Sequence, residues 1–299
     1  MICRKKRSDH GEALRGIRSL SKDLVLILLA LGSLAPICIA SGPGWSVNAD
    51  PDTLKEIQML PVRDPARVDI LQNRGIGLAA EGKFDQALDQ FRGAAALDPN
   101  NSAMLINMAY CLDKLCRYDE AIAELQRAKQ LDPGNALIYL NWGNSLLNLK
   151  KYEEALDPLQ KANDLNPSNA LTHLDLAASF TNLKRYKEAS REFERAAAID
   201  PKDPRIFFNW AIVLSAEDDI AQAIKKYERV IELDPKDPAA YYNCAALLER
   251  IGRLDGAIEK IRSALAVQPD NAMFKDILGQ LEQARRKHEP VARAPAEPQ

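Results

Sequence analysis

The sequence predicts an all-α fold, a solenoid built from stacked helix-turn-helix repeats. The first observation behind this prediction is a short turn phrase, written LDPGNA at residues 131–136, which recurs along the chain. The second is its spacing: the prolines of the phrase follow one another every 34 residues without an insertion, and 34 residues is a repeat length typical of helix-turn-helix solenoids. These prolines are Pro99, Pro133, Pro167, Pro201, Pro235 and Pro269, and one more step back reaches Pro65.

Small residues recur at three positions when the repeats are aligned from Val68. Two helices approach closely only where side chains are small, so these positions are expected to be the crossing points within each pair. Position 8 holds Gly75, Ala109, Gly143, Ala177, Ala211 and Ala245; position 20 holds Ala87, Ala121, Ala155, Ala189, Ala223 and Ala257; position 27 holds Ala94, Ala128, Ala162, Ala196, Val230 and Ala264.

Large apolar residues recur between the small ones and are expected to fill the core. Position 24 carries Phe91, Leu125, Leu159, Phe193, Tyr227 and Ile261, and position 11 carries Leu78, Leu112, Leu146, Phe180, Leu214 and Leu248. This alternation of large and small residues over residues 68–271 resembles the tetratricopeptide repeat family. The resemblance implies a right-handed superhelical solenoid whose first helices line a concave surface.

The turn phrase predicts where one helix ends and the next begins. Proline lacks an N–H and disfavours helix in the residue before it, so Asp132-Pro133 ends one helix. Asn135 is then placed to cap the following helix by accepting a hydrogen bond from a free N–H group. Six units follow from this register: 68–101, 102–135, 136–169, 170–203, 204–237 and 238–271.

The flanks of the repeats are expected to protect their ends. Residues 41–67 are predicted to be a linker with a partial capping helix, and residues 272–287 a C-terminal capping helix. The Pro/Ala-rich residues 288–299 are predicted to be disordered. Within the third unit Pro158 is expected to bend the second helix, since its ring removes one backbone hydrogen bond.

Residues 1–40 have the composition of an export signal. Seven Lys or Arg residues precede or flank an apolar run at residues 24–40, and a polar, glycine-containing stretch follows. Two alternatives remain open: a cleaved signal peptide, or an uncleaved anchor that crosses the membrane through residues 24–40. Either one predicts repeats that lie outside the cytoplasm, in a periplasmic or other extracytoplasmic compartment.

Composition and motifs argue against several classes of function. A net charge of −2 does not favour nucleic acid as a partner. The histidines His10, His173 and His288 fall in the export segment, at a core position and in the tail, and no nucleophile, phosphate-binding or zinc motif is present. The cysteines Cys111, Cys116 and Cys244 lack metal-type spacing and are interpreted as unpaired structural thiols. The sequence therefore predicts a non-enzyme without a cofactor or metal.

A ladder of short polar side chains is the best candidate for a binding surface. Position 6, which the resemblance places on the concave surface with positions 2, 5, 9 and 12, holds Asn73, Asn107, Asn141, Asp175, Asn209 and Asn243. An amide donates and accepts at once, so such a column can hold a peptide backbone. The alternative is that these side chains are only a solvated inner face.

Apolar residues accompany the ladder in the later units. A contiguous apolar patch commonly marks a binding site, although the same residues can instead pack between neighbouring repeats. Position 5 reads Leu140, Leu174, Phe208 and Tyr242, with Leu137 and Leu171 at position 2 and Ile212 at position 9. The basic residues that tetratricopeptide cochaperones use to grip a C-terminal carboxylate are not matched, because Asp175 stands where a cation would be needed.

These features together predict a non-catalytic scaffold or adaptor for protein interactions. Its partner is expected to be an extended peptide or a helix bound in the concave groove, with a role in cell-envelope assembly. Two alternatives are a self-associating structural scaffold, which would be a homo-oligomer, and a regulatory module for a separately encoded enzyme.

Overall fold

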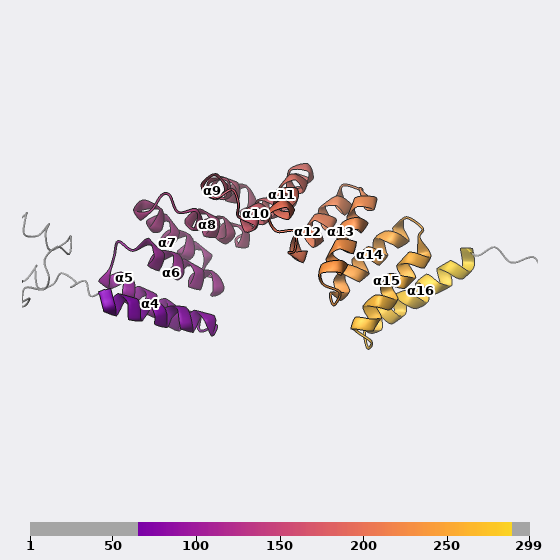
Figure 1. Ribbon diagram of the computed structural model, residues 1–299, viewed down its shortest axis with the longest axis horizontal. Helices are drawn as coiled ribbons and strands as arrows, with labels where there is room; N and C mark the ends of the chain where they lie inside the picture. The colour runs from indigo at the N-terminus through magenta and orange to yellow at the C-terminus, as the bar shows by residue number, and fades with distance from the viewer. Residues whose placement is uncertain (1–64, 289–299) are drawn as a thin grey trace, which may run out of the picture. The chain divides into compact units, whose positions relative to one another are not determined.

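The computed structural model describes residues 65–288, and all regular structure within them is helical (Figure 1). Thirteen helices are present in this range. Their bounds are α4 (Pro65–Ala80), α5 (Phe84–Leu97), α6 (Ser102–Lys114), α7 (Tyr118–Leu131), α8 (Ala136–Asn148), α9 (Tyr152–Leu165), α10 (Ala170–Asn182), α11 (Tyr186–Ile199), α12 (Pro204–Ala216), α13 (Ile220–Leu233), α14 (Pro238–Arg250), α15 (Leu254–Val267) and α16 (Ala272–His288).

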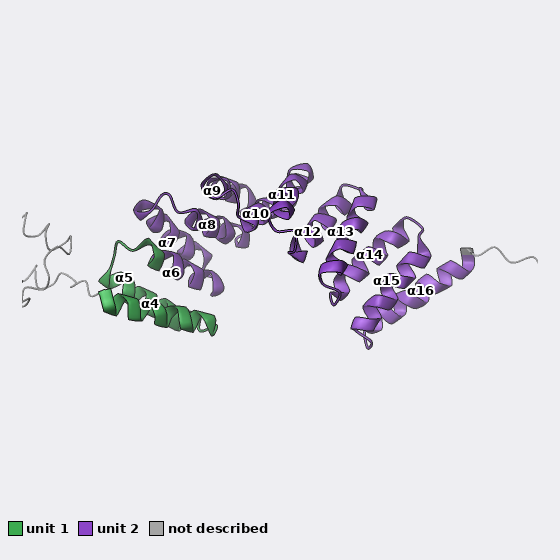
Figure 2. Cartoon of the chain, viewed as in Figure 1, with its two compact units in different colours: residues 1–104 green, residues 105–299 purple. Residues whose placement is uncertain are grey.

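The chain divides into two compact units, with the boundary inside α6 (Figure 2). The described part of the first unit, residues 65–104, consists of the packed pair α4 and α5 and the first turn of α6. The second unit begins at Leu105 and contains the remaining helices through α16. Each unit is considered by itself below.

Helices of the second unit pack in consecutive pairs. The pairs are α8 with α9, α10 with α11, α12 with α13 and α14 with α15, and the second helix of each pair packs on the first helix of the next. The helix α16 packs on α15 and ends the series (Figure 1). This arrangement confirms the predicted fold class, an all-α solenoid of helix-turn-helix repeats.

The small positions of the repeat are the crossing points of each pair. The alanines at position 20 are fully buried, and those at positions 8 and 27 nearly so. At Gly143 a Cβ atom would lie 2.4 Å from the Leu159 side chain, and at Gly75 it would lie 2.7 Å from Phe91. Positions 8 and 24 therefore meet face to face, as the alternation of small and large residues predicted.

Overfilling a crossing point is expected to destabilise the fold. Ala189→Leu inserts three heavy atoms at a fully buried position of α11 and should lower the free energy of unfolding by about 1–3 kcal/mol. Ala198→Leu, at an exposed position of the same helix, should change it by about 0.5 kcal/mol or less. Urea unfolding followed by circular dichroism measures both, and equal stabilities would show that the register is wrong.

Side-chain caps begin the first helices α6, α8, α10, α12 and α14 at a 34-residue interval. The Asn135 Oδ1 accepts from the Leu137 N–H at 3.1 Å, as predicted, and Asn169 does the same for Leu171 at 3.0 Å. Aspartate replaces asparagine in the next two turns, where Asp203 and Asp237 accept at 2.9 and 2.8 Å. Each turn thus satisfies one of the N–H groups that a helix start leaves without an intrahelical acceptor.

The turn proline also has a recurring partner, which the sequence pattern did not reveal. Its carbonyl accepts a hydrogen bond from the side chain six residues later: from the Tyr139 hydroxyl to Pro133 at 3.1 Å, and from the Tyr241 hydroxyl to Pro235 at 3.3 Å. Phe207 has no donor at the equivalent place. Instead, the Arg229 guanidinium donates to the Pro201 carbonyl at 3.3 Å.

A left-handed residue closes the turn inside every described pair. The φ angles are 77° at Gly82 and 76° at Gly252, but four of these turns use other residues. The left-handed conformation is strained for residues that have a side chain, so glycine is the residue that would have predicted it from the sequence. Glycine occupies this position in only two of the described units. The other four are Cys116 (58°), Lys150 (60°), Lys184 (59°) and Asp218 (66°).

Two glycines with open surroundings should respond oppositely to alanine. No atom lies within 4 Å of a Cβ built at Gly252 or at Gly279, so backbone conformation alone decides. Gly252→Ala should destabilise by about 1 kcal/mol because of its positive φ. Gly279→Ala, inside α16, should stabilise by about 0.5–1 kcal/mol through helix propensity. Thermal unfolding of both variants tests this, and a shift of the same sign would contradict it.

Several expectations concern positions at the ends of the described range. The helix α4 begins at Pro65, three residues before the predicted first unit, since proline at the first helical position removes only an N–H that has no intrahelical acceptor. The cap α16 packs through Phe274 and Leu281. Among residues 65–288 no helix has the length and hydropathy needed to cross a membrane. The predicted export segment, most of the linker and the tail lie outside the described residues.

Two local predictions concern Pro158 and the cysteines. The helix α9 continues through Pro158, whose side chain is buried. Cys111 and Cys244 are buried, Cys116 is exposed, and all three are free thiols. Burial raises the pKa of both buried thiols to about 11, so they remain protonated packing groups at neutral pH.

Candidate functional site

A pocket of about 320 Å³ lies between α10 and α12, where the first helices of two successive pairs face each other. Its walls combine apolar and polar side chains from the positions that the repeat pattern assigns to the inner surface. The lining residues are Leu171, Leu174, Asp175, Ala178, Thr181, Asn182, Phe193, Arg205, Asn209 and Ile212.

Three of the nine predicted groove residues line this pocket. Leu174 and Asp175 come from α10, and Asn209 comes from α12. Leu171 and Ile212, also expected on the inner surface, are 43% and 44% exposed and form its open rim. The ladder of polar residues at position 6 and the apolar residues at positions 2, 5 and 9 therefore meet in this pocket, in the units 170–203 and 204–237.

The other predicted groove residues lie outside the pocket. Asn107, Asn141 and Asn243 are half-buried on α6, α8 and α14. Leu140 is buried. Phe208 packs edge-on against Tyr227 with ring centroids 5.5 Å apart, and Tyr242 stacks on Phe274 of α16 at 6.0 Å. These two aromatic rings therefore contribute to packing between neighbouring helices, which was the alternative left open for position 5.

Asp175 is the unusual member of the ladder. Its side chain is 8% exposed, and its Oδ2 atom has no hydrogen-bond partner among the described residues. Burial raises the pKa of Asp175 to about 7, while a hydrogen bond from Asn144 and the positive charge of Arg205 oppose the shift. The carboxyl group therefore changes charge near neutral pH.

Arg205 lies on the rim but is already occupied. Its guanidinium donates to the Asp203 carboxylate through Nε at 3.0 Å and through one terminal nitrogen at 2.6 Å. This pair lowers the pKa of Asp203 and raises that of Arg205. The pocket thus has one buried carboxyl group and a rim cation neutralised by its own neighbour.

Besides Arg205, four lining residues were not predicted from the sequence to belong to the groove. Ala178 and Thr181 occupy positions 9 and 12, which the family resemblance had assigned to the inner surface, so the signal was present. Thr181 and Asn182 bond carbonyls of their own helix at 2.7 and 2.8 Å. Phe193 is a buried core residue of α11 that also lines the pocket, a role that no inner-surface pattern indicates.

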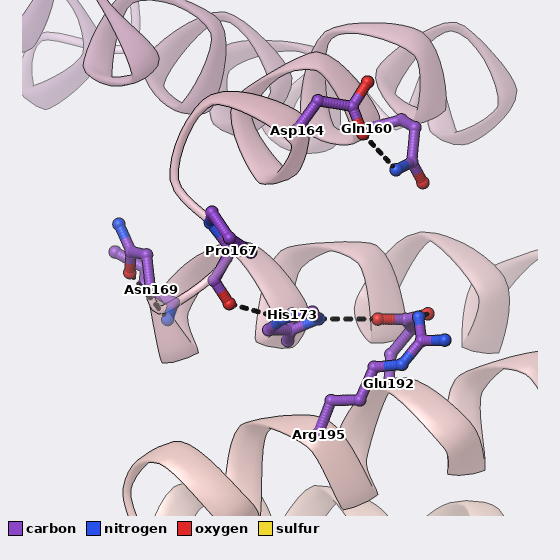
Figure 3. A network of polar contacts seen from close by, with 8 residues as sticks. Gln160, Asp164, Pro167, Asn169, His173, Glu192 and Arg195 are labelled. Atoms are coloured by element: carbon purple, nitrogen blue, oxygen red, sulfur yellow. Dashed lines mark hydrogen bonds and ion pairs between the residues drawn. The ribbon is translucent and has the colours of Figure 1, made fainter.

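A buried polar network fixes the back of α10 (Figure 3). The His173 Nδ1 atom lies 2.7 Å from Glu192 Oε2 on α11, and its Nε2 lies 3.4 Å from the Pro167 carbonyl. The Arg195 guanidinium donates to the other Glu192 oxygen at 2.6 Å. This network ties α10 to α11 and to the preceding turn, so it positions the helix that carries Leu174 and Asp175.

A second polar link joins the first helices of two other pairs. The Ser145 hydroxyl on α8 donates to the Asp113 carboxylate on α6 at 2.9 Å. Burial raises the pKa of Asp113 to about 6, although this hydrogen bond opposes the shift. Residues 65–288 contain no cluster of His, Cys, Asp or Glu that could hold a metal ion.

The architecture defines a class of protein, a solenoid of helix pairs with its pocket on the first helices. The profile of the tetratricopeptide repeat family matches residues 78–140, 146–207 and 214–281, more than half of the chain. The chain belongs to the tetratricopeptide repeat family. No curated protein matches it at a significant level.

Solved structures with the same fold are numerous. PilF of Pseudomonas aeruginosa is 20% identical, with a TM-score of 0.62, and the match covers 72% of this chain and 98% of PilF. YrrB, described as a tetratricopeptide repeat protein with an unusual peptide-binding site, is 24% identical, with a TM-score of 0.53 and coverages of 66% and 97%. A chain of the APC/C hetero-tetramer Cut9–Hcn1 is 21% identical, with a TM-score of 0.59 and coverages of 73% and 44%. At these identities the likeness shows the fold.

Proposed function

We propose that this protein is a non-catalytic adaptor that binds a segment of a partner protein in the groove between α10 and α12. The pocket carries the proposal, since its lining combines exposed apolar side chains with several polar groups. Leu171 and Ile212 are large apolar residues exposed on the same surface as Asn209. An apolar stripe beside an amide suits a peptide, whose side chains and backbone need both kinds of contact.

Selection from a random-peptide display library against the full chain in mild detergent tests this proposal. Peptides are expected to be selected, and Ile212→Glu should weaken their binding by about tenfold or more, because it places a charge in the apolar rim. Ile199→Glu is the matched control, since Ile199 is similarly exposed, at 38% against 44%, but does not line the pocket. Failure to select peptides, or equal binding by both variants, would refute groove binding.

Self-association through the same surface is the second candidate, favoured by the exposed Leu137, Leu171 and Ile212 side chains. A dimer formed through the groove should dissociate when the exposed Leu171 and Ile212 are changed to glutamate. Light scattering across a concentration series measures this, and a monomer at every concentration would exclude self-association.

A cell-envelope location completes the proposal and rests on the sequence of residues 1–40, where a basic segment precedes an apolar run. A reporter enzyme that is active only outside the cytoplasm, fused to the C-terminus, should be active in a bacterial host. Two lysines introduced at Ile27 and Leu29 should abolish the signal. Activity that survives this change, or is missing from the unaltered fusion, would contradict export.

A further inference from the structure

We propose that the Asp175 pocket is a specificity subsite that receives the basic side chain, arginine or lysine, of the bound segment. This inference rests on groove binding as proposed above and adds the chemistry of the partner. The observation behind it is an acceptor without a donor: Asp175 lines the pocket, is more than nine-tenths buried, and its Oδ2 has no hydrogen-bond partner among residues 65–288.

The Asp175 Oδ2 atom would be stabilised by a hydrogen-bond donor from a bound partner. Leaving a buried polar atom without its hydrogen bond is costly, and more so for a carboxylate. The Asn144 amide and Arg205 act on the carboxyl group, yet Oδ2 remains without a partner among the described residues. An arriving cationic group supplies the hydrogen bond and the opposite charge together.

The shape and polarity of the pocket suit a long basic side chain. Arginine and lysine carry an aliphatic stem below their charged group and bury that stem along apolar surface. Leu171, Leu174 and Ile212 provide such an apolar surface in the wall and rim of the pocket. A pocket of about 320 Å³ has room for one side chain of this size.

The charges around the pocket favour a cation over an anion. Among the charged residues that face Asp175 or the rim, Asp175 and Asp203 are acidic and Arg205 is basic, so a bound cation balances the group. Arg205 is also held by Asp203 through its Nε and a terminal nitrogen, which limits its repulsion of an incoming cation. A ligand carboxylate placed at Arg205 would instead lie near Asp175.

Asp175 differs in charge from the other residues at position 6 of the repeats. The other five members of position 6 are asparagines, which can hold a peptide backbone but supply no charge. Asp175 alone adds charge, so it can select a side chain where its neighbours cannot. Since burial raises the pKa of Asp175 to about 7, a basic ligand should bind less tightly as the pH falls below neutrality.

The test is peptide selection against the full chain and two variants that lose the same charge. Asp175→Asn keeps the shape of the subsite, whereas Asp157→Asn changes an exposed residue of α9 outside the pocket. Peptides selected by the natural chain should share arginine or lysine at one fixed position, and so should those selected by Asp157→Asn. The enrichment should vanish with Asp175→Asn.

A selected arginine peptide then gives a direct measurement. Replacing its arginine with the neutral isostere citrulline should weaken binding by about tenfold or more, and Asp175→Asn should weaken the arginine peptide similarly. Peptides without a shared basic residue, or with one that Asp175→Asn preserves, would overturn the subsite while leaving groove binding intact. Selection of no peptides would overturn both, so the two failures are distinguishable.

Discussion

His173→Leu is expected to lower the free energy of unfolding by about 3 kcal/mol, because it removes the partner of the buried Glu192 Oε2 atom. Glu192 is 7% exposed, and its Oε2 atom lies 2.7 Å from the His173 ring. Arg195 still donates to the other oxygen, but its side chain is mostly exposed and does not enter the space that the imidazole fills. Urea unfolding followed by circular dichroism measures the loss.

A double variant separates the effect of losing the His173–Glu192 interaction from the effect of changing the side-chain packing. With Glu192→Leu added to His173→Leu, stability should return to within about 1 kcal/mol of the natural chain, since no buried charge remains. Glu188→Leu, which breaks the partly exposed Arg185–Glu188 pair on the same helix, should cost about 1 kcal/mol or less. If His173→Leu leaves the free energy of unfolding unchanged, the buried His173–Glu192 pair does not form.

Asp175→Asn is expected to stabilise the protein above neutral pH by about 1–3 kcal/mol. Burial raises the pKa of Asp175 from 3.8 to about 7, so the folded state favours the protonated carboxyl while the unfolded state ionises freely. The natural chain therefore loses stability as the pH rises from about 4 to about 7 and none further above it. Asparagine, which resembles the protonated acid, avoids that loss.

Unfolding curves at pH 4.5 and pH 8 test this sign. The difference between the natural chain and Asp175→Asn should be small at pH 4.5, where the loss has only begun, and largest at pH 8. Asp157→Asn, at an exposed position of α9, should change stability by about 0.5 kcal/mol or less at both values. Destabilisation by Asp175→Asn at pH 8 would mean that Oδ2 already has a partner in the protein. If Asp175→Asn is more stable than the natural chain, Asp175 lowers stability, as expected of a residue that is retained for binding.

The fold was accessible from the sequence because its determinants repeat. The alanines at position 20, such as Ala189, stand where two helices cross, and Asn135 and Asn169 cap helices where the turn phrase placed them. Crossing points and helix caps that recur at a fixed spacing can be predicted from the sequence without a structure. Among the nine groove residues predicted from the inner-surface positions, Leu174, Asp175 and Asn209 line one pocket and the other six lie outside it.

The exceptions arise where contacts join positions that do not share a pattern. His173 was predicted to be a core residue, but its pairing with Glu192 on the next helix depends on two substitutions that occur together in a single unit. The ionisation of Asp175 depends on its depth and on Asn144 and Arg205, which come from the first helices of the pairs before and after its own. The left-handed turn residues Lys150 and Lys184 carry no signal, because the backbone imposes a conformation that lysine does not prefer.

The pattern of helix packing has a consequence for how such a surface can change over generations. Helices of the second unit pack on the one before and the one after, and the first helices α8 and α10 also touch. A duplicated or deleted block of 34 residues would therefore add or remove one helix pair without disturbing distant pairs. The length and the charge of the inner surface can then evolve separately: the number of blocks sets its length, and a single exchange such as asparagine for aspartate at residue 175 changes its charge at one place.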